Sequence, residues 1–366
     1  MKRQMKTRIR EAAAAVTMVS ATVALAACSG EGGTGGGGSG ARIGLLLPEA
    51  TTARWETQDR PLIEKEIKDL CGDCTVEHAN AKGDVATQQQ QVDSMITKGV
   101  DAIILIAVDA RSLGGAVRKA DQADIPVIAY DRLAEGPISG YVSFNGEEVG
   151  RLQARALLKA MGERADDGQI VMMNGDPRDP NAISLRKGAL SVFRDRVEIG
   201  KAYDTPLWRA ETANMNMSGA ISTLGADTIR GVYAANDGLA AGSISALKAN
   251  KVAPLPPVTG QDAELGALRR IVGGDQSMTV YKPFAPEAAA GAAMAVAAAR
   301  GESLDDIATG KVSAGTGEEV PAVLLTPVAV TAGNVADTVV KDGVYTVRQI
   351  CTPQLREACD KAGLTS

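Results

Sequence analysis

Short apolar runs alternate with amphipathic segments along the chain from residue 41 onward. Runs rich in Ile, Val, Leu and Ala occupy residues 42–47, 102–107 and 126–130, and a weaker one covers 74–79. Between them, apolar residues recur at helical spacing in residues 59–70, 84–98 and 112–123. Strands that are apolar on both faces and alternate with helices are typical of a parallel sheet covered on both sides. This part of the chain therefore predicts a doubly wound α/β lobe.

The following part of the chain repeats the same plan. We expect strands at 169–173, 197–202, 231–234, 258–260 and 278–281, and helices at 147–161, 183–193, 211–224, 238–249 and 286–300. No single linker separates the two parts, so the chain is expected to cross between two lobes more than once. Two similar lobes joined by several crossings form a hinged cleft. Ligands of such sheets bind beyond the carboxyl ends of the strands.

Residues 1–27 have the pattern of an export signal. Five Lys and Arg residues within positions 2–10 precede an apolar stretch at 12–27, which is too short and too rich in Ala to predict a membrane span. The stretch ends in Leu25-Ala26-Ala27-Cys28, which is similar to a bacterial lipobox. We expect a lipid on Cys28, residues 28–40 as a Gly/Ser-rich tether, and anchoring to the outer face of the cytoplasmic membrane. An ordinary secretory signal with an unrelated Cys is the alternative.

The other four cysteines form two close pairs, Cys71 with Cys74 and Cys351 with Cys359. Local disulfides are the simplest interpretation for an exported protein. The sequence from Cys71 to Cys74 also fits a redox or metal motif, and that alternative stays open. However, no second pair of this spacing supplies zinc ligands, and the motif follows a predicted helix. A thiol at the start of a helix would instead have its pKa lowered. We expect no metal and no cofactor.

Composition and charge exclude some classes of function for this chain. The chain of 366 residues has 3% aromatic residues, with only 2 Trp, and a single His, His78. One His rules out metal sites built on several His residues. The formal net charge is -5, and the export segment carries five of the cations but only one acid, so the exported part is more acidic still. An acidic chain lacks the clustered Lys and Arg that grip nucleic acid. A binding protein, with no nucleic-acid partner, is the leading class.

Polar residues and both tryptophans follow the predicted strands. The set comprises Arg54, Trp55, Asp109, Asp131, Arg132, Asn174, Asp176, Asn181, Trp208, Asn236, Asp237, Asp262 and Lys282. Carboxylates and amides accept hydrogen bonds from hydroxyls, Arg and Lys donate to the same oxygens, and an indole covers the C–H face of a sugar ring. Acids and amides at strand ends also cap helices. That alternative applies to Asp109, Asn174, Asp176 and Asp237, and core packing is the alternative for the tryptophans.

Six short motifs in order resemble the periplasmic sugar-binding proteins of ABC importers. They are Ala53-Arg54-Trp55, Ala129-Tyr130-Asp131-Arg132, Val142-Ser143-Phe144-Asn145, Ala235-Asn236-Asp237, Thr259-Gly260-Gln261-Asp262-Ala263-Glu264 and Met278-Thr279-Val280-Tyr281-Lys282-Pro283. The resemblance covers about residues 41–347 and is strongest to the xylose-binding members. It implies a periplasmic-binding-protein type I fold, with two doubly wound lobes joined by a three-crossover hinge. It also implies a monomer that delivers one monosaccharide, with D-xylose as the first candidate, to a permease driven by a separate ATPase.

The resemblance also implies site residues and domain boundaries. Hydrogen-bonding positions of the family match Arg54, Asp131, Asn181, Asn236, Asp262 and Lys282, and its stacking positions match Trp55 and Trp208. The loop at Asp109 and the surroundings of Trp208 depart from the family pattern. We expect an N-terminal lobe from 41–143 plus 263–311, a C-terminal lobe from 144–262 plus 312–350, and a disulfide-bonded tail at 351–366.

Three other functions remain to be compared with the sugar importer. A transcriptional regulator with the same sensor fold is disfavoured because the first 40 residues carry an export signal and no helix-turn-helix pattern. A glycosidase needs a protonated carboxyl, whereas Arg132 and Lys282 should keep Asp131 and Asp262 ionised. A receptor for another aldose that feeds a chemosensory partner stays open. We therefore expect a binding protein that is not an enzyme.

Overall fold

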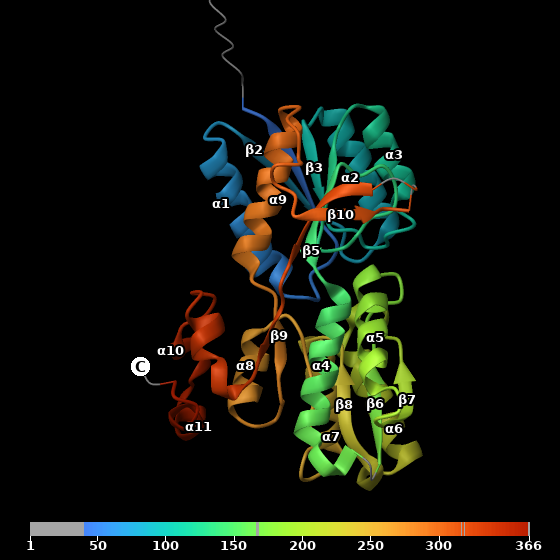
Figure 1. Ribbon diagram of the computed structural model, residues 1–366, viewed down its shortest axis with the longest axis vertical. Helices are drawn as coiled ribbons and strands as arrows, with labels where there is room; N and C mark the ends of the chain where they lie inside the picture. The colour runs from blue at the N-terminus through green and yellow to red at the C-terminus, as the bar shows by residue number, and fades with distance from the viewer. Residues whose placement is uncertain (1–39, 166–167, 316, 318, 365–366) are drawn as a thin grey trace, which may run out of the picture. The chain divides into compact units, whose positions relative to one another are not determined.

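The structure is a computed structural model that describes residues 40–165, 168–315, 317 and 319–364. The predicted export signal, Cys28 and the tether up to residue 39 lie outside the described residues. Within them, the chain forms two α/β lobes, each with its own sheet (Figure 1).

The N-terminal lobe is built on a seven-stranded sheet with the order β10-β11-β5-β4-β3-β1-β2, in which only the β10–β11 pair is antiparallel. Its strands are β1 (Arg42–Leu47), β2 (Thr75–Asn80), β3 (Ala102–Leu105), β4 (Val127–Tyr130), β5 (Gly140–Phe144), β10 (Gly310–Ser313) and β11 (Glu319–Leu325). Its helices are α1 (Arg60–Leu70), α2 (Val85–Lys98), α3 (Gly114–Gln122) and α9 (Phe284–Ala299).

The helices of this lobe cover both faces of its sheet. Successive side chains of β1 point to opposite faces. Leu45 and Leu47 therefore pack with α1 and α9, whereas Leu46 packs with α2 and α3. This two-sided burial explains why the central strands are apolar without alternation.

The C-terminal lobe has a three-stranded parallel sheet in the order β7-β6-β8, made of β6 (Gln169–Met173), β7 (Glu198–Tyr203) and β8 (Ile229–Ala234). Residues 258–260 extend it, because Val258 bridges Val232 in parallel. The helices α4 (Gly146–Met161) and α5 (Pro180–Phe193) pack as one pair, and α6 (Ala210–Leu224) and α7 (Asp237–Ala249) as another. One apolar cluster joins these elements.

The chain crosses between the lobes three times. The crossings run from β5 to α4, from β9 (Thr279–Tyr281) to α9, and from β11 to β12 (Val328–Val330). The predicted type I fold with a three-crossover hinge is therefore confirmed. β9 and β12 pair with each other in antiparallel fashion. β9 also continues the C-terminal sheet, since Val280 N donates to Gly260 O at 3.0 Å.

Two of the predicted domain boundaries are wrong. Residues 263–281 were expected in the N-terminal lobe, but β9 hydrogen-bonds to residues 260 and 262 of the C-terminal lobe. Residues 312–325 were expected in the C-terminal lobe, but β11 pairs in parallel with β5 of the N-terminal sheet. The reason is that β9 has only three residues and that β11 pairs with a strand distant in sequence, so no local pattern shows which sheet either of them joins.

The C-terminal segment packs on the hinge side of the C-terminal lobe. Its helices α10 (Val347–Ile350) and α11 (Arg356–Lys361) share an apolar cluster with α8 (Leu265–Val272), with Tyr281 of β9 and with Val330 of β12. In the structure Cys351 is bonded to Cys359, and Cys71 to Cys74. None of the helices in the described residues is long and apolar enough to cross a membrane.

Candidate ligand-binding site

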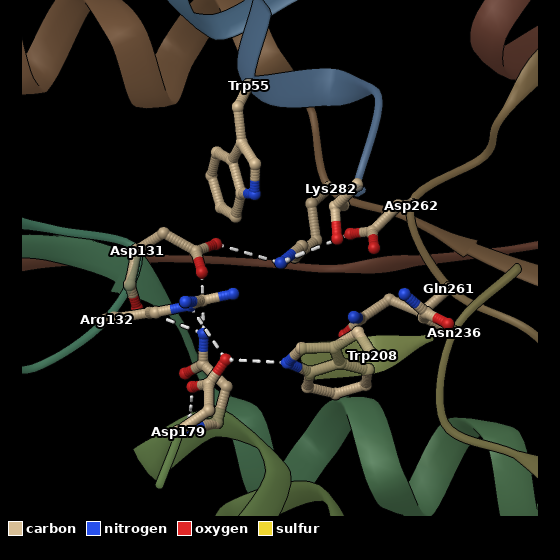
Figure 2. Close-up of a pocket in the computed structure, with 11 residues that line it drawn as sticks. Trp55, Asp131, Arg132, Asp179, Trp208, Asn236, Gln261, Asp262 and Lys282 are labelled. Carbon is tan, nitrogen blue, oxygen red and sulfur yellow. Dashed lines mark hydrogen bonds and ion pairs between the residues drawn. The ribbon is translucent and has the colours of Figure 1, made fainter. Parts of the chain in front are cut away.

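A small cavity lined mainly by polar and charged side chains lies where strand ends of both lobes meet. The N-terminal lobe contributes Trp55 and Thr52 after β1, and Asp131 and Arg132 after β4. The C-terminal lobe and the hinge contribute the remaining lining residues, which are Asp179, Asn181, Trp208, Asn236, Gln261, Asp262 and Lys282 (Figure 2). This position beyond the carboxyl ends of parallel strands is the one that the doubly wound topology provides for a ligand.

Asp131 is the centre of the charge network around the cavity. One carboxylate oxygen accepts from Lys282 Nζ at 2.8 Å and from Arg54 Nη1 at 3.1 Å, and the other accepts from Asn181 Nδ2 at 2.6 Å. Burial alone would raise the pKa of Asp131, but the charges of Lys282 and Arg54 outweigh it and lower the pKa to about 2. Asp131 is therefore an ionised acceptor at any physiological pH.

Lys282 links the two acids of the cavity. Its Nζ lies 2.8 Å from Asp131 and 3.4 Å from Asp262 Oδ1. Burial lowers the pKa of the Lys282 ammonium, but the attraction of these two carboxylates leaves it raised overall. Asp262 differs from Asp131 in that its buried Oδ1 accepts no hydrogen bond from any described residue. This oxygen also lies 3.8 Å from Arg54 Nη1, so two long ion pairs hold it while its hydrogen-bonding capacity remains available to a ligand.

The two tryptophans line the cavity from different lobes (Figure 2). The indole Nε1 of Trp55 donates to Glu49 Oε1 at 2.7 Å, and that of Trp208 donates to Asp179 Oδ2 at 3.1 Å. Trp208 also lies flat against Gly175, where any Cβ would overlap its ring. Both rings belong to the apolar cluster of their own lobe as well. Each indole is therefore fixed on its polar edge and presents part of its surface to the cavity.

An ion pair joins the lobes across the cavity. Arg132 Nε of the N-terminal lobe lies 2.7 Å from Asp179 Oδ2 of the C-terminal lobe. Asp179 begins α5 as its N-cap, because Oδ1 accepts from the backbone N–H of Asn181 at 2.9 Å. Burial raises the pKa of Asp179 despite the charge of Arg132. The same carboxylate thus caps a helix, holds Trp208 and bridges the lobes.

Backbone strain is concentrated at this site. Nine described residues other than Gly have a positive φ, and five of them lie in or next to the cavity: Asp131, Leu207, Trp208, Asp262 and Ala263. Such conformations are unfavourable for L-residues and persist where the surroundings enforce them, which is typical of functional sites.

Arg54 was expected to contact a ligand, but the structure places it behind the cavity. Its guanidinium pairs with both oxygens of Asp59, at 2.6 and 2.7 Å, and with Glu287 Oε2 at 2.5 Å. Only Nη1 reaches the cavity acid Asp131. Arg54 is therefore not among the lining residues and acts through Asp131, because two acids that the sequence did not single out occupy most of its donors.

Asp109 is not a cavity residue either. Its Oδ1 accepts from the backbone N–H of Ser112 at 2.8 Å, so it stabilises a turn, whereas the N-cap of the following helix α3 is Leu113. Asp237 is buried below the site and accepts from Thr279 Oγ1 at 2.9 Å, and Asp176 holds the backbone of Leu207. Asn236 both caps a helix and lines the cavity. Its Oδ1 accepts from the backbone N–H of Leu239 at 2.9 Å at the start of α7, and its side chain is one of the lining residues.

Sequence reasoning missed Thr52, Asp179 and Gln261 among the lining residues. Gln261 lies next to Asp262 inside a motif quoted for the family. Its position directly after the strand at 258–260 could have identified it as a site residue. Asp179 precedes Pro180 at the start of α5, which predicts a cap but not the contact with Arg132. One described group of acidic and thiol side chains has metal-ligand spacing, namely Cys71, Asp73 and Cys74, and both of its thiols are in a disulfide.

Comparison with known proteins places the chain in a family. The model of the periplasmic binding protein domain matches residues 43–303. The chain belongs to the periplasmic binding protein family. A D-xylose-binding periplasmic protein of Escherichia coli is 35% identical over 83% of this chain and 91% of its own length. A multiple sugar-binding periplasmic receptor of Rhizobium radiobacter is 30% identical, over 84% of this chain and 92% of its own.

Solved structures of the family share the architecture. A solute-binding protein of an ABC transporter from Clostridium phytofermentans, with bound β-D-glucose, superposes with a TM-score of 0.78 and 29% identity. The alignment covers 84% of this chain and 99% of that one. Membership of a periplasmic binding protein family agrees with the prediction of a binding protein that is not an enzyme, and with export from the cytoplasm.

Proposed function

We propose that this protein is a lipid-anchored receptor of an ABC sugar importer and that it binds one neutral monosaccharide, with D-xylose as the first candidate. The observation that carries the proposal is the cavity itself, in which carboxylates and an ammonium lie between two indoles. The identity to D-xylose-binding proteins of two organisms supports the choice of a pentose.

The lining groups suit the hydroxyls of a sugar. Asp131 and Asp262 would accept from hydroxyls, and Lys282 and the Nδ2 groups of Asn181 and Asn236 would donate to the same oxygens. Trp55 and Trp208 would cover the two faces of the ring, where C–H groups leave apolar surface. Each hydroxyl that is missing from a wrong ligand would leave a buried protein group unpaired, at a cost of about 1–3 kcal/mol.

Ligand binding would be coupled to closure of the lobes. The cavity takes its walls from both lobes, and Asn181 and Asp179 of one lobe bond to Asp131 and Arg132 of the other. A sugar that contacts both walls favours the closed form by its differential affinity for it. The permease, powered by its ATPase, would then recognise the closed receptor.

Cys28 would carry the lipid, residues 28–40 would act as the tether, and both disulfides would form outside the cytoplasm. Replacing Cys28 with Ser should release the protein from the membrane fraction. Unchanged membrane association of that variant would contradict the anchor but not the sugar site.

Calorimetry with a panel of monosaccharides tests the proposal. We expect one neutral pentose or hexose to bind with a Kd in the micromolar range or below. D-glucuronate should bind far more weakly, because its carboxylate would meet the ionised Asp131. The variant Asp109→Asn is a matched control, since it changes a carboxylate outside the cavity and should retain the affinity. Absence of binding to every monosaccharide would overturn the proposal.

A further inference from the structure

The loop after β7 holds two consecutive residues in the left-handed region, Leu207 at φ 57° and Trp208 at φ 53°. Neither is a Gly, Asn or Asp, the residue types that tolerate this region best. The loop is kept in place by the backbone N–H of Leu207, which donates to Asp176 Oδ2 at 2.8 Å, and by that of Trp208, which donates to Thr205 O at 3.1 Å. Asp176 is itself fixed by Arg178 Nη2 at 2.6 Å.

The strained loop sends its two side chains to different places. Trp208 turns inward against Gly175 and lines the cavity. Leu207 reaches the N-terminal lobe at Gly83, in the turn between β2 and α2. A Cβ built on Gly83 would lie 2.9 Å from Leu207 Cδ2. Gly83 has φ 82°, and the preceding Lys82 has φ 53°, so a second left-handed turn receives the leucine.

We propose that Leu207 is a positioning residue for the ligand site: by docking on Gly83 it holds the lobes closed at the rim and keeps Trp208 over the cavity. The proposal rests on the proposed sugar-binding function. Neither Leu207 nor Gly83 lines the cavity, so the contact does not depend on ligand atoms. The polar bridges Asn181–Asp131 and Arg132–Asp179 differ in this respect, because all four of their residues line the cavity.

The absence of a side chain at residue 83 is part of the contact. Leucine can approach the backbone of the turn because Gly83 has no Cβ, and a glycine also adopts the positive φ without strain. A branched side chain at this position would push Leu207 away and would keep the rim of the closed form apart. Removing the leucine side chain should have the same effect on closure from the other lobe.

The affinity for the sugar and the rate of sugar release measure how much the contact between Leu207 and Gly83 stabilises the closed form. We expect Leu207→Ala and Gly83→Val each to weaken binding of the sugar by about tenfold, mainly through faster release. Leu207→Met, which keeps a long apolar side chain, should restore the wild-type values. Gly99→Val is the matched control for backbone strain. Gly99 also has a positive φ, of 64°, but nothing lies within 4 Å of its Cβ position, so this variant should lose stability and retain affinity.

Fluorine NMR of protein labelled with 5-fluorotryptophan gives a readout that does not require sugar. The chain has 2 Trp residues, and single Trp→Phe variants assign their resonances. In Leu207→Ala we expect the Trp208 resonance to move while that of Trp55 stays in place, and Leu207→Met to match the wild type. Unchanged sugar release in Leu207→Ala and Gly83→Val, or an equal shift of both resonances, would overturn the proposal.

The two proposals fail in different ways. If the wild-type protein binds no monosaccharide, the proposed function is wrong, and the Trp208 resonance alone decides the role of Leu207. An unmoved Trp208 resonance in Leu207→Ala would then reject that role as well.

Discussion

The two walls of the cavity are built differently. The N-terminal wall is a network in which the charged groups pair closely with one another: Asp131 binds Lys282 and Arg54, and Arg54 binds Asp59 and Glu287. On the C-terminal wall, Asp262 Oδ1 accepts no hydrogen bond from the described residues and lies 3.4 Å from Lys282 Nζ and 3.8 Å from Arg54 Nη1. This wall also carries four of the five strained residues of the site, Leu207, Trp208, Asp262 and Ala263.

The difference indicates a division of work between the lobes. A network whose members are already bonded needs no rearrangement when a ligand arrives, which lowers the cost of binding. A vacant acceptor on the opposite wall gains its hydrogen bond only when a ligand is present. The N-terminal wall is therefore a preformed binding surface. The C-terminal wall supplies hydrogen bonds that form only with the ligand and so stabilise the closed form.

The largest effect is expected from Asp131→Asn. This change removes one negative charge that Lys282 and Arg54 share in a buried site. Removing one partner of a buried ion pair leaves the remaining charge uncompensated, which typically costs about 3–5 kcal/mol. We expect a clear drop in the thermal unfolding temperature of the sugar-free protein and loss of detectable sugar binding by calorimetry.

The matched comparison is the sugar-free stability of the two variants Asp131→Asn and Asp262→Asn. If the N-terminal wall is the preformed one, only the change at Asp131 lowers the unfolding temperature strongly. Equal destabilisation by both changes would show that the two walls do not differ in this way.

A smaller and more selective effect is expected from Asp262→Asn. Asp262 Oδ1 accepts no hydrogen bond from the described residues and lies 3.4 Å from Lys282 Nζ and 3.8 Å from Arg54 Nη1, so its loss breaks only two long ion pairs in the free protein. The ligand would lose one charge-assisted hydrogen bond, worth about 1.5–3 kcal/mol, which corresponds to roughly 10- to 150-fold in Kd. Calorimetry measures the affinity, and a scan of thermal unfolding without sugar serves as its control. Wild-type affinity in this variant would remove Asp262 from the ligand site.

The sequence predicted the residues that line the cavity better than the residues that hold them in place. Among the residues that line the cavity on both walls, Asp131, Asp262 and Lys282 stand at strand ends in recognisable motifs and Asn181 matches a position of the family, and the structure brings all four together. Asp59 and Glu287 were not singled out, because each lies in a helical segment: Asp59 meets Arg54 across five residues of one segment, and Glu287 meets it only through tertiary packing. A carboxylate inside a helical pattern carries no local signal that it is buried.

For the fold as well, elements with a local sequence pattern were predicted and elements that depend on distant partners were not. Long apolar strands flanked by helices, such as β1 and β6, were expected at nearly the observed residues. The strands β5, β10, β11 and β12 were not expected, and β10 and β11 lie at one of the two misplaced lobe boundaries. The partner of β11, β5, is far away in the chain, so this pairing depends on contacts that periodicity does not encode.

The last prediction concerns pH, has the smallest effect within any single pH unit, and distinguishes the charges within the N-terminal wall. Burial raises the pKa of Glu287 to about 8, more than the nearby Arg54 lowers it. The unfolded chain loses this proton near pH 4.3, so the folded state holds the extra proton between about pH 5 and 8. Stability from this group is therefore present at low pH and is lost as pH rises, by up to about 1.4 kcal/mol per unit.

Chemical denaturation at pH 5, 6, 7 and 8 measures this slope. Asp131 contributes nothing to it, because its lowered pKa of about 2 confines its loss of stabilisation to strongly acidic solution. Glu264, whose pKa burial raises to about 7, adds a slope of the same sign in both proteins. The difference between the wild type and Glu287→Gln therefore isolates Glu287, and the variant should have the flatter profile. Identical profiles would mean that Glu287 is ionised beside Arg54 throughout this range, and that the N-terminal wall carries one more negative charge.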